Sequence, residues 1–274
     1  MINRYTVIGQ PISHSLSPVV HSIFGELTQR KIHYTRTEST PEEFESAVRE
    51  WLKSGAKGCN VTSPFKEQAV QICDKLSEEA RRAGSVNTIH AQRDGALAGY
   101  TTDGIGLVTD IAANKQHAIA DQSVLILGAG GATRGVMQAI LKQNPQKLHI
   151  ANRTAEKAVA LAEMFSDLGS VSGGGYDDVS QAGQFDIVIN ATPLGVSDNM
   201  PELPDTILQK GGLAYDMTYA SRETPFMAWA RQRGATTANG LGMLVEQAAE
   251  SFLVWEGARP KTRLVYPRLL DMLA

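Results

Sequence analysis

The sequence predicts an α/β protein with two domains. At 274 residues, the chain is longer than a typical single domain. Short apolar runs alternate with helical patterns over roughly the first hundred residues, and the alternation starts again at a glycine-rich turn near residue 128. Hydrophobic residues make up 42% and charged residues 20%, the balance of an ordinary folded protein. We therefore expect two separate hydrophobic cores.

The first domain is predicted to begin with three strands and a hairpin. The runs 5–9 (YTVIG), 32–38 (IHYTRTE) and 56–62 (AKGCNVT) indicate the strands, and 85–100 indicates a hairpin that turns at Asp94-Gly95. Helices are predicted where a capping residue precedes proline. These pairs are Ser17-Pro18, Thr40-Pro41 and Ser63-Pro64, and the second of these helices should end near Lys53.

The second domain is predicted to contain buried parallel strands, because its apolar runs are short and have helical segments between them. The runs are 123–127, 147–151, 185–192, 212–217 and 235–240, and "SGGGY" (172–176) is expected to be only a flexible loop. Beyond Gly240 the pattern is purely helical. One helix face carries Leu244, Ala248, Ser251, Phe252 and Trp255, and a final short helix follows Pro267. With no strand of its own, this segment should pack on the first domain.

Charge and composition exclude several classes of function. The net charge of -3, with scattered Lys and Arg, offers no general attraction for nucleic acid. No apolar run approaches the roughly 20 residues that span a bilayer, and the N-terminal apolar stretch is too short for a signal peptide. Cys59 and Cys73 form neither a CxxC motif nor a disulfide framework. We therefore expect a cytoplasmic protein without membrane or nucleic-acid partners, and the sequence leaves open whether it forms a homodimer.

A glycine-rich turn, "GAGGAT", follows the strand at 123–127 and precedes a helical stretch. Gly128 permits a tight turn, Gly130 lets the backbone approach a pyrophosphate, and the helix N-terminus supplies N–H donors to the anion. The strand–turn–helix–strand context favours this interpretation over a glycine turn without a nucleotide. Thr133 stands where Gly or Ala is usual, which should loosen helix–strand packing slightly.

The next strand ends in a basic segment rather than an acidic one. NAD-binding folds usually carry an Asp or Glu about 20 residues after the glycines, whereas a 2′-phosphate requires a cation. Arg153 stands 22 residues after Gly131, and Lys157 follows four residues later on the same side of the expected helix. A solvated basic turn is the alternative. Because the acid is missing and two cations are present, the sequence predicts NADP as the cofactor.

Several polar residues stand at predicted strand ends of the first domain. Taken singly, Ser15, Asn60, Asn87 and Asp103 have ordinary structural explanations, and Lys66 in the first turn of a helix is mildly unfavourable because it opposes the helix dipole. Neither an HExxH motif nor a Cys/His cluster indicates a metal, and no GxSxG motif indicates a serine nucleophile. Hydride transfer needs an acid–base group at the substrate oxygen, and Lys66 with Asp103 would supply one.

The chain resembles the NADP-dependent shikimate dehydrogenases. The motifs that carry this resemblance are "SHSLSP", "NVTSPFKE", "AGSVNT", "TDGIG", "GAGGATRG", "NRTAEKA", "NATPLG", "YDMTY", "TPFMAWA" and "NGLGMLVEQAAESFLVW", which extend over nearly the whole chain. The resemblance implies a discontinuous α/β substrate-binding domain, residues 1–104 and 241–274, with a doubly wound Rossmann domain that binds NADP at 105–240. It also implies the interconversion of 3-dehydroshikimate and shikimate in aromatic amino-acid and chorismate biosynthesis.

The resemblance also implies roles for individual residues. Lys66 and Asp103 match the catalytic pair of the family. The residues that match groups around the substrate carboxylate are Ser15, Ser17 and Tyr219, and those that match the remaining ring contacts are Asn60, Thr62, Asn87 and Gln247. The residues that match the cofactor site are Gly128, Ala129, Gly130, Gly131, Ala132, Asn152, Arg153, Thr154, Lys157, Met217 and Gly240.

Three positions depart from the family pattern. Thr101 stands where Asn is frequent, Thr133 replaces a smaller residue, and Lys157 replaces Arg. The last change keeps the charge but loses the two-pronged geometry of a guanidinium, which affects the strength of the NADP preference.

Three alternative functions share some of these features. An NAD-dependent quinate/shikimate dehydrogenase of broader specificity would carry Asp near residue 153 or 154, which is absent here. A folate-linked methylene dehydrogenase has a similar architecture, but the paired serines and "NVTSPFKE" argue against it. An NADP-binding sensor without catalysis is disfavoured by the presence of both Lys66 and Asp103.

Overall fold

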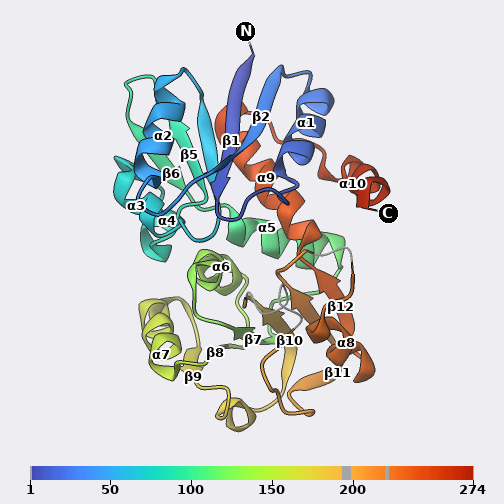
Figure 1. Ribbon diagram of the computed structural model, residues 1–274. Helices are drawn as coiled ribbons and strands as arrows, with labels where there is room; N and C mark the ends of the chain where they lie inside the picture. Colours follow the sequence, from blue (N-terminus) through green and yellow to red (C-terminus); the bar gives the residue numbers. More distant parts are fainter. Residues whose placement is uncertain (1, 193–198, 220–221, 274) are drawn as a thin grey trace. The chain divides into compact units, whose positions relative to one another are not determined.

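The computed structural model describes residues 2–192, 199–219 and 222–273 and divides into two compact units (Figure 1). Unit 1 comprises Met1–Gly106 and Leu244–Ala274, and unit 2 comprises Leu107–Met243. These bounds lie two and three residues from the boundaries at 104 and 240 that the resemblance implied. In the described part of the chain, no helix is long and apolar enough to cross a membrane.

The sheet of unit 1 has six strands in the order β2-β1-β3-β5-β6-β4. Its neighbours β2, β1 and β3 are parallel, whereas β5 and β6 form an antiparallel hairpin. The bounds are β1 Asn3–Gly9, β2 Ile32–Glu38, β3 Gly58–Val61, β4 Lys75–Leu76, β5 Thr88–Ala91 and β6 Leu97–Tyr100. The predicted hairpin turn is confirmed: Gly95 has φ +86° and the Asp94 carboxylate accepts a hydrogen bond from the Ala96 N–H at 3.0 Å.

Helices cover both faces of this sheet because its strands alternate their apolar side chains between the two faces. Ile8 packs with α2 to α4, whereas Tyr5 and Val7 pack toward Trp255 of α9 (Figure 1). The bounds are α1 Ser17–Thr28, α2 Phe44–Lys53, α3 Gln68–Ile72, α4 Glu78–Ala83, α5 Asp103–Thr109, α9 Leu241–Glu256 and α10 Tyr266–Leu273, with a 3-10 turn at Thr262–Leu264. The packing of the C-terminal segment on the first domain is thus confirmed.

The sheet of unit 2 is fully parallel, in the order β12-β11-β10-β7-β8-β9. Its bounds are β7 Ser123–Leu127, β8 Lys147–Ala151, β9 Val171–Gly174, β10 Phe185–Asn190, β11 Leu208–Asp216 and β12 Thr236–Asn239. This is the strand order of doubly wound dinucleotide-binding sheets, and the order reverses between β7 and β10, where such folds bind ligands. The predicted fold class is confirmed.

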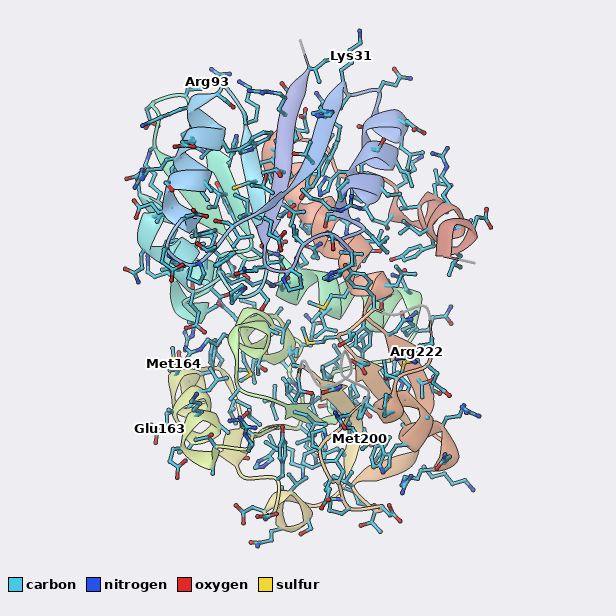
Figure 2. All side chains as sticks on the ribbon, viewed as in Figure 1. Lys31, Arg93, Glu163, Met164, Met200 and Arg222 are labelled. Atoms are coloured by element: carbon cyan, nitrogen blue, oxygen red, sulfur yellow. The ribbon has the colours of Figure 1, made fainter. Side chains whose placement is uncertain are left out.

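The helices of unit 2 cover both faces of its sheet. Val124 and Ile126 of β7 pack toward α6 (Gly131–Leu141) and α7 (Ala155–Met164), whereas Leu125 and Leu127 pack toward α8 (Pro225–Gln232). Shorter helical turns lie at Asp110–Asn114, Ser166–Leu168 and Val179–Ala182. Figure 2 shows charged side chains such as Lys31 and Arg93 in unit 1 and Glu163 in unit 2 pointing away from the sheets.

Three predicted helix starts and one predicted loop were wrong. Helix α1 begins at Ser17 itself with Leu16 in the cap position, and neither α1 nor α2 has a side-chain cap. Helix α2 starts at Phe44, and α3 starts only at Gln68, four residues after Pro64, because proline is also favoured in turns. The predicted loop at 172–176 contains most of β9, where a Cβ on Gly173 would lie 2.3 Å from the Ala158 carbonyl oxygen of α7. Here glycine marks close packing rather than flexibility.

Candidate active site

The centre of the site in unit 1 is an ion pair between Lys66 and Asp103. The Lys66 ammonium Nζ donates to Asp103 Oδ2 at 2.6 Å, and the two side chains are only 19% and 6% exposed. Lys66 lies in the turn after β3, two residues before the five-residue α3, so its predicted place in the first turn of a helix was wrong. The direct ion pair, rather than a helix dipole, is therefore the main local influence on this ammonium.

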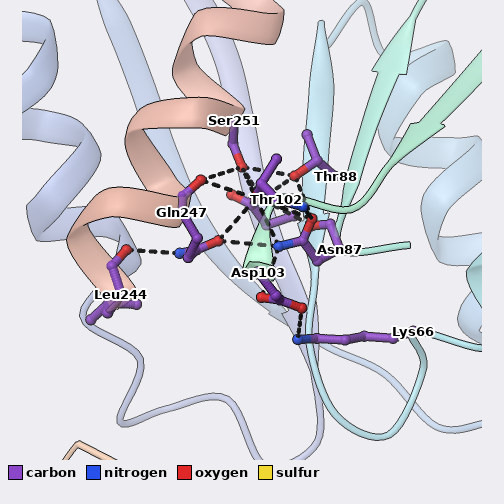
Figure 3. A network of polar contacts seen from close by, with 9 residues as sticks. Lys66, Asn87, Thr88, Thr102, Asp103, Leu244, Gln247 and Ser251 are labelled. Atoms are coloured by element: carbon purple, nitrogen blue, oxygen red, sulfur yellow. Dashed lines mark hydrogen bonds and ion pairs between the residues drawn. The ribbon is translucent and has the colours of Figure 1, made fainter. Parts of the chain in front are cut away.

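Asn87 connects this ion pair to the rest of the site. The backbone N–H of Thr102 can only donate, and it donates to Asn87 Oδ1 at 2.9 Å. The amide group of Asn87 is therefore fixed with its NH2 on the opposite side, where Nδ2 donates to Asp103 Oδ1 at 3.0 Å and to Gln247 Oε1 at 3.2 Å (Figure 3). Both carboxylate oxygens of Asp103 accept hydrogen bonds, which suits the ionised form.

Helix α9 contributes the next group of contacts. Gln247 Nε2 donates to the Leu244 carbonyl at 2.9 Å, which fixes the orientation of its amide and turns Oε1 toward Asn87 (Figure 3). The Thr102 hydroxyl donates to the Gln247 carbonyl at 3.0 Å and accepts from Asn87 Nδ2 at 2.9 Å. The Thr102 hydroxyl therefore connects α9 with Asn87, and Thr102 directly precedes Asp103 in the chain.

A buried polar layer continues from Asn87 to Asn60. The Tyr34 hydroxyl donates to Asn60 Oδ1 at 2.7 Å, and burial raises the pKa of Tyr34 well above its usual value, so this hydroxyl stays protonated. Asn60 Nδ2 donates to the Asn87 carbonyl at 3.0 Å and to Ser251 Oγ at 3.0 Å. The hydroxyls of Ser251 and Thr88 lie 2.7 Å apart. These contacts connect the end of β3 and the start of β5 with α9.

Of the predicted serine pair, Ser15 lies in the loop between β1 and α1 (residues 10–16, called the serine loop below), and Ser17 is the first residue of α1. Ser15 and Ser17 are both buried, Ser15 Oγ donates to Ser17 Oγ at 3.2 Å, and the Ser17 N–H donates to Ser15 Oγ at 3.3 Å. Thr62, half-buried at the end of β3, donates its backbone N–H to Ile8 of β1 at 2.9 Å. The carboxyl ends of β1 and β3 thus bring these groups to one edge of the sheet. The N-terminus of the twelve-residue α1 at this edge favours a bound anion.

The sequence does not predict a role at this site for five of its polar residues. They are Tyr34, Arg36, Thr88, Thr102 and Ser251. Ser251 had one usable signal, since it is a hydroxyl residue on an otherwise apolar helix face and is fully buried. Thr102 stands next to Asp103, but nothing in the sequence shows that its hydroxyl connects to α9.

The glycine turn of unit 2 has the geometry that a pyrophosphate requires. Gly128 has φ +102°, a conformation that glycine adopts readily, and Gly130 is the N-cap of α6. A Cβ on Gly130 would meet nothing within 4 Å, so the backbone stays open to a ligand. The fully buried Thr133 donates its hydroxyl to the Gly128 carbonyl at 2.8 Å. Rather than loosening the packing as predicted, Thr133 braces the turn.

The basic segment after β8 is exposed, so a phosphate group can reach it. Arg153, Thr154 and Lys157 are exposed, and Asn152 is half-buried, with its Nδ2 donating to the Thr154 carbonyl at 2.9 Å. Burial raises the pKa of the Tyr176 phenol, and the nearby positive charge of Arg153 opposes that shift. Arg153 and Lys157 are the donors here that fit a 2′-phosphate.

Met217 and Gly240 lie in direct contact at the ends of β11 and β12. A Cβ on Gly240 would lie 2.2 Å from the Met217 carbonyl oxygen, so only glycine allows this approach. Tyr219, half-buried, follows in the same unit. Tyr219 thus belongs to unit 2, whereas Ser15 and Ser17 belong to unit 1.

Comparisons with known proteins agree with this architecture. The family model described as the shikimate dehydrogenase substrate binding domain matches residues 7–89, and the model described as shikimate / quinate 5-dehydrogenase matches residues 110–195. The shikimate dehydrogenase (NADP(+)) of Alkalilimnicola ehrlichii is 49% identical over 270 residues, which cover 98% of this chain and 99% of that protein. The protein of the same name from Alcanivorax borkumensis is 50% identical over 268 residues, which cover 97% and 95%.

A solved structure shows the same similarity. The shikimate 5-dehydrogenase of Thermus thermophilus, crystallised with NADP(H) and shikimate, has a TM-score of 0.87 at 30% identity and covers 99% of this chain and 100% of its own. The doubly wound sheet with its glycine turn defines a dinucleotide-binding protein. The chain belongs to the shikimate dehydrogenase family.

Proposed function

We propose that this protein is an NADP-dependent oxidoreductase that interconverts 3-dehydroshikimate and shikimate, a step of aromatic amino-acid and chorismate biosynthesis. Family membership and the names of its relatives support the reaction class. The observation that carries the proposal is the Lys66–Asp103 ion pair, which a buried polar layer connects through Asn87 and Asn60 to Tyr34. Such a layer suits a small, hydroxylated, carboxylated ring.

The chain supplies the proton chemistry of this reaction. Bound NADPH supplies the hydride, that is, two electrons and the hydrogen that joins the carbonyl carbon. As negative charge develops on the carbonyl oxygen, the Lys66 ammonium donates a proton to it, and Asp103 holds the ammonium in place. In the opposite direction, the neutral amine of Lys66 accepts the hydroxyl proton. Gln247, whose amide is fixed, offers the ring hydroxyls the second hydrogen of Nε2 and a lone pair of Oε1, and Asn87 holds Gln247 and Asp103 in place beside the ring.

The remaining predicted roles are part of the proposal. Ser15, Ser17 and Tyr219 bind the substrate carboxylate, while Asn60 and Thr62 contact the ring. In unit 2, the turn from Gly128 to Ala132 binds the pyrophosphate. The other proposed cofactor contacts are Asn152, Arg153, Thr154, Lys157, Met217 and Gly240. Their support is the open backbone at Gly130 and the exposed cations after β8.

Location and partners follow from the same proposal. Both cysteines are free, and burial raises the pKa of each thiol, which suits a reducing cytoplasm. The partners are small molecules.

An absorbance assay tests the proposed function. Purified protein with shikimate should produce the absorbance of reduced nicotinamide, and the rate at limiting cofactor should be higher with NADP than with NAD. If NADP binds but shikimate gives no reduction, the protein is a sensor and the proposal fails. Equal or faster turnover of quinate, or a preference for NAD, would instead indicate the quinate/shikimate alternative.

A further inference from the structure

Strand β2 places an arginine against the serine loop. Arg36 Nε and Nη2 both donate to the Ser15 carbonyl oxygen, at 2.9 and 2.6 Å. The Arg36 residue itself is exposed, so the guanidinium keeps access to solvent and its charge. Two prongs of a guanidinium usually bind a carboxylate or phosphate. Here both hold one backbone carbonyl, which belongs to the residue whose hydroxyl contacts Ser17.

The serine loop needs such a cation if it binds a carboxylate. Ser15 and Ser17 offer neutral hydroxyls, and the nearby Lys66 ammonium is already paired with Asp103. An ionised carboxylate that leaves water loses hydration, and neutral donors alone replace it incompletely. The N-terminus of α1 supplies a partial positive charge, and Arg36 adds a full one. Charges within about 10 Å still interact at ordinary ionic strength.

We infer that Arg36 is a specificity-determining and positioning residue for the substrate carboxylate. It clamps the Ser15 backbone, so that the two serine hydroxyls keep their arrangement, and its charge favours an anionic ring substrate over a neutral one. This inference rests on the proposed function. It predicts that the effect of Arg36 depends on the charge of the substrate, which a merely structural arginine would not show.

The test compares shikimate with its uncharged methyl ester in the intact protein at saturating NADP. For Arg36→Met, KM for shikimate should rise about 5- to 30-fold, in the range of one partly exposed charge-assisted hydrogen bond. The kcat should stay within about threefold, because the reacting carbon is held by other residues. The KM for the ester should rise much less than the KM for shikimate, because the ester carries no charge and loses only the positioning of the serines. The preference for shikimate over the ester should also lose most of its dependence on ionic strength.

Two further variants separate charge from geometry. Arg36→Lys keeps the charge but not the fork, so it should preserve most of the preference for shikimate, with a smaller rise in KM. Arg4 lies in the same sheet and also donates to a backbone carbonyl, that of Ser54, outside the serine loop. Arg4→Met should therefore leave both KM values within about twofold.

Specific outcomes contradict the inference. Equal increases in KM for shikimate and the ester would show that Arg36 is only structural, and an unchanged KM for shikimate would remove it from the site. If Arg36→Met does not fold, Arg36→Lys decides, since a complete loss of the preference for shikimate in that variant excludes the charge effect. A wild-type protein that does not oxidise shikimate refutes the proposed function, and this inference with it.

Discussion

The carboxylate of Asp103 accepts hydrogen bonds from two donors, Lys66 on one oxygen and Asn87 on the other. Neither donor can move without leaving a mostly buried carboxylate oxygen without its partner, which is costly. The ammonium of Lys66 is thus held at a fixed position by a group that is itself fixed by Asn87. This arrangement suits proton transfer, which depends on position before anything else.

Lys66→Ala should lower kcat by about 10²- to 10⁴-fold, the usual contribution of a positioned acid–base group. Shikimate binding should weaken much less, because the serine loop, Asn87 and Gln247 remain. Steady-state kinetics and a direct binding measurement check this. Asp103→Asn should also lower kcat, and the double variant should lose far less than the product of the two single losses, since the pair acts as a unit.

Lys75 offers a matched control, since it forms an ion pair with Asp94 but is mostly exposed. Lys75→Ala should leave kcat unchanged. Near-normal turnover in Lys66→Ala, combined with a raised KM, would make Lys66 a binding residue and refute the acid–base mechanism.

His21 is a buried histidine next to the polar layer. Its ring stacks on Tyr34 with centroids 4.3 Å apart, and within the described part of the chain neither ring nitrogen meets the geometry of a hydrogen bond. Burial lowers the pKa of His21 from 6.5 to about 3. Between these two pH values the unfolded chain binds more protons at this residue than the folded chain, so the free energy of unfolding falls as the pH falls.

We therefore expect His21→Phe to reduce the acid sensitivity of the fold. Below pH 6.5 the wild-type free energy of unfolding should decrease more steeply than that of the variant, by up to about 1.4 kcal/mol per pH unit, the effect of one proton. Denaturant titrations at a series of pH values measure both slopes. Above pH 7.5 the two slopes should coincide, which is the internal control, and coinciding slopes between pH 6 and 4 would contradict the expected role of burial.

The sequence predicted the charged and amide residues of the site but not the hydroxyls that order them. Lys66, Asn87 and Gln247 were named because their chemistry or the family motifs single them out. Thr102 and Ser251 act through contacts between segments about 150 residues apart in the chain, which no local pattern reveals. Arg36 was missed for a different reason, because an arginine on an exposed strand face has an ordinary explanation.

At the scale of elements, prediction succeeded for strands and failed at helix starts. Strands β7, β8 and β10 have apolar runs that only a buried strand explains, and each was found. Proline after a small polar residue marks both helix starts and turns, so Pro64 was misinterpreted. The glycines of β9 were misinterpreted as a loop because the close approach of α7 is not visible in the sequence.

The end of β8 should determine which dinucleotide is preferred. Arg153→Ala should weaken NADP binding about 10- to 100-fold, since a charge-assisted hydrogen bond to phosphate contributes roughly 1.5–3 kcal/mol, and NAD binding should change little. Titration calorimetry with each cofactor measures this. Arg231→Ala, which removes an exposed cation from α8, is the matched control. Equal losses for NADP and NAD would remove Arg153 from the specificity role.

At the scale of the whole molecule, unit 1 consists of two separate stretches of chain and unit 2 of one. The alternating pattern alone predicted two domains, and the absence of a strand beyond Gly240 predicted where the C-terminal helices would pack. The boundary residues differ from the predicted ones by two and three positions, because α5 and α9 run through the boundaries without a break.

Each ligand should therefore protect its own unit in hydrogen exchange. With shikimate, amides at the ends of β1 and β3 and the start of α1 should exchange more slowly, and with NADP those of the β7–α6 turn should do so. At about 100 times the dissociation constant, the slowing should approach 100-fold where opening releases the ligand. Mass spectrometry of peptic fragments resolves these segments. Protection by shikimate confined to the β7–α6 turn would contradict the assignment of ligands to units.

The discontinuity of unit 1 also determines the order in which the two units can complete their folds while the ribosome synthesises the chain. Unit 2 is a single stretch, so all of its strands have emerged before α9 is complete. Unit 1 must wait, because Tyr5 stacks on Trp255 at 4.4 Å and donates its hydroxyl to Glu256 at 2.7 Å, while Asn60 donates to Ser251. Until those residues leave the exit tunnel, the N-terminal strands of the nascent chain keep exposed the part of one face that α9 covers in the folded unit. The N-terminal strands of unit 1, which are translated before unit 2, are thus the segment that depends longest on protection from aggregation.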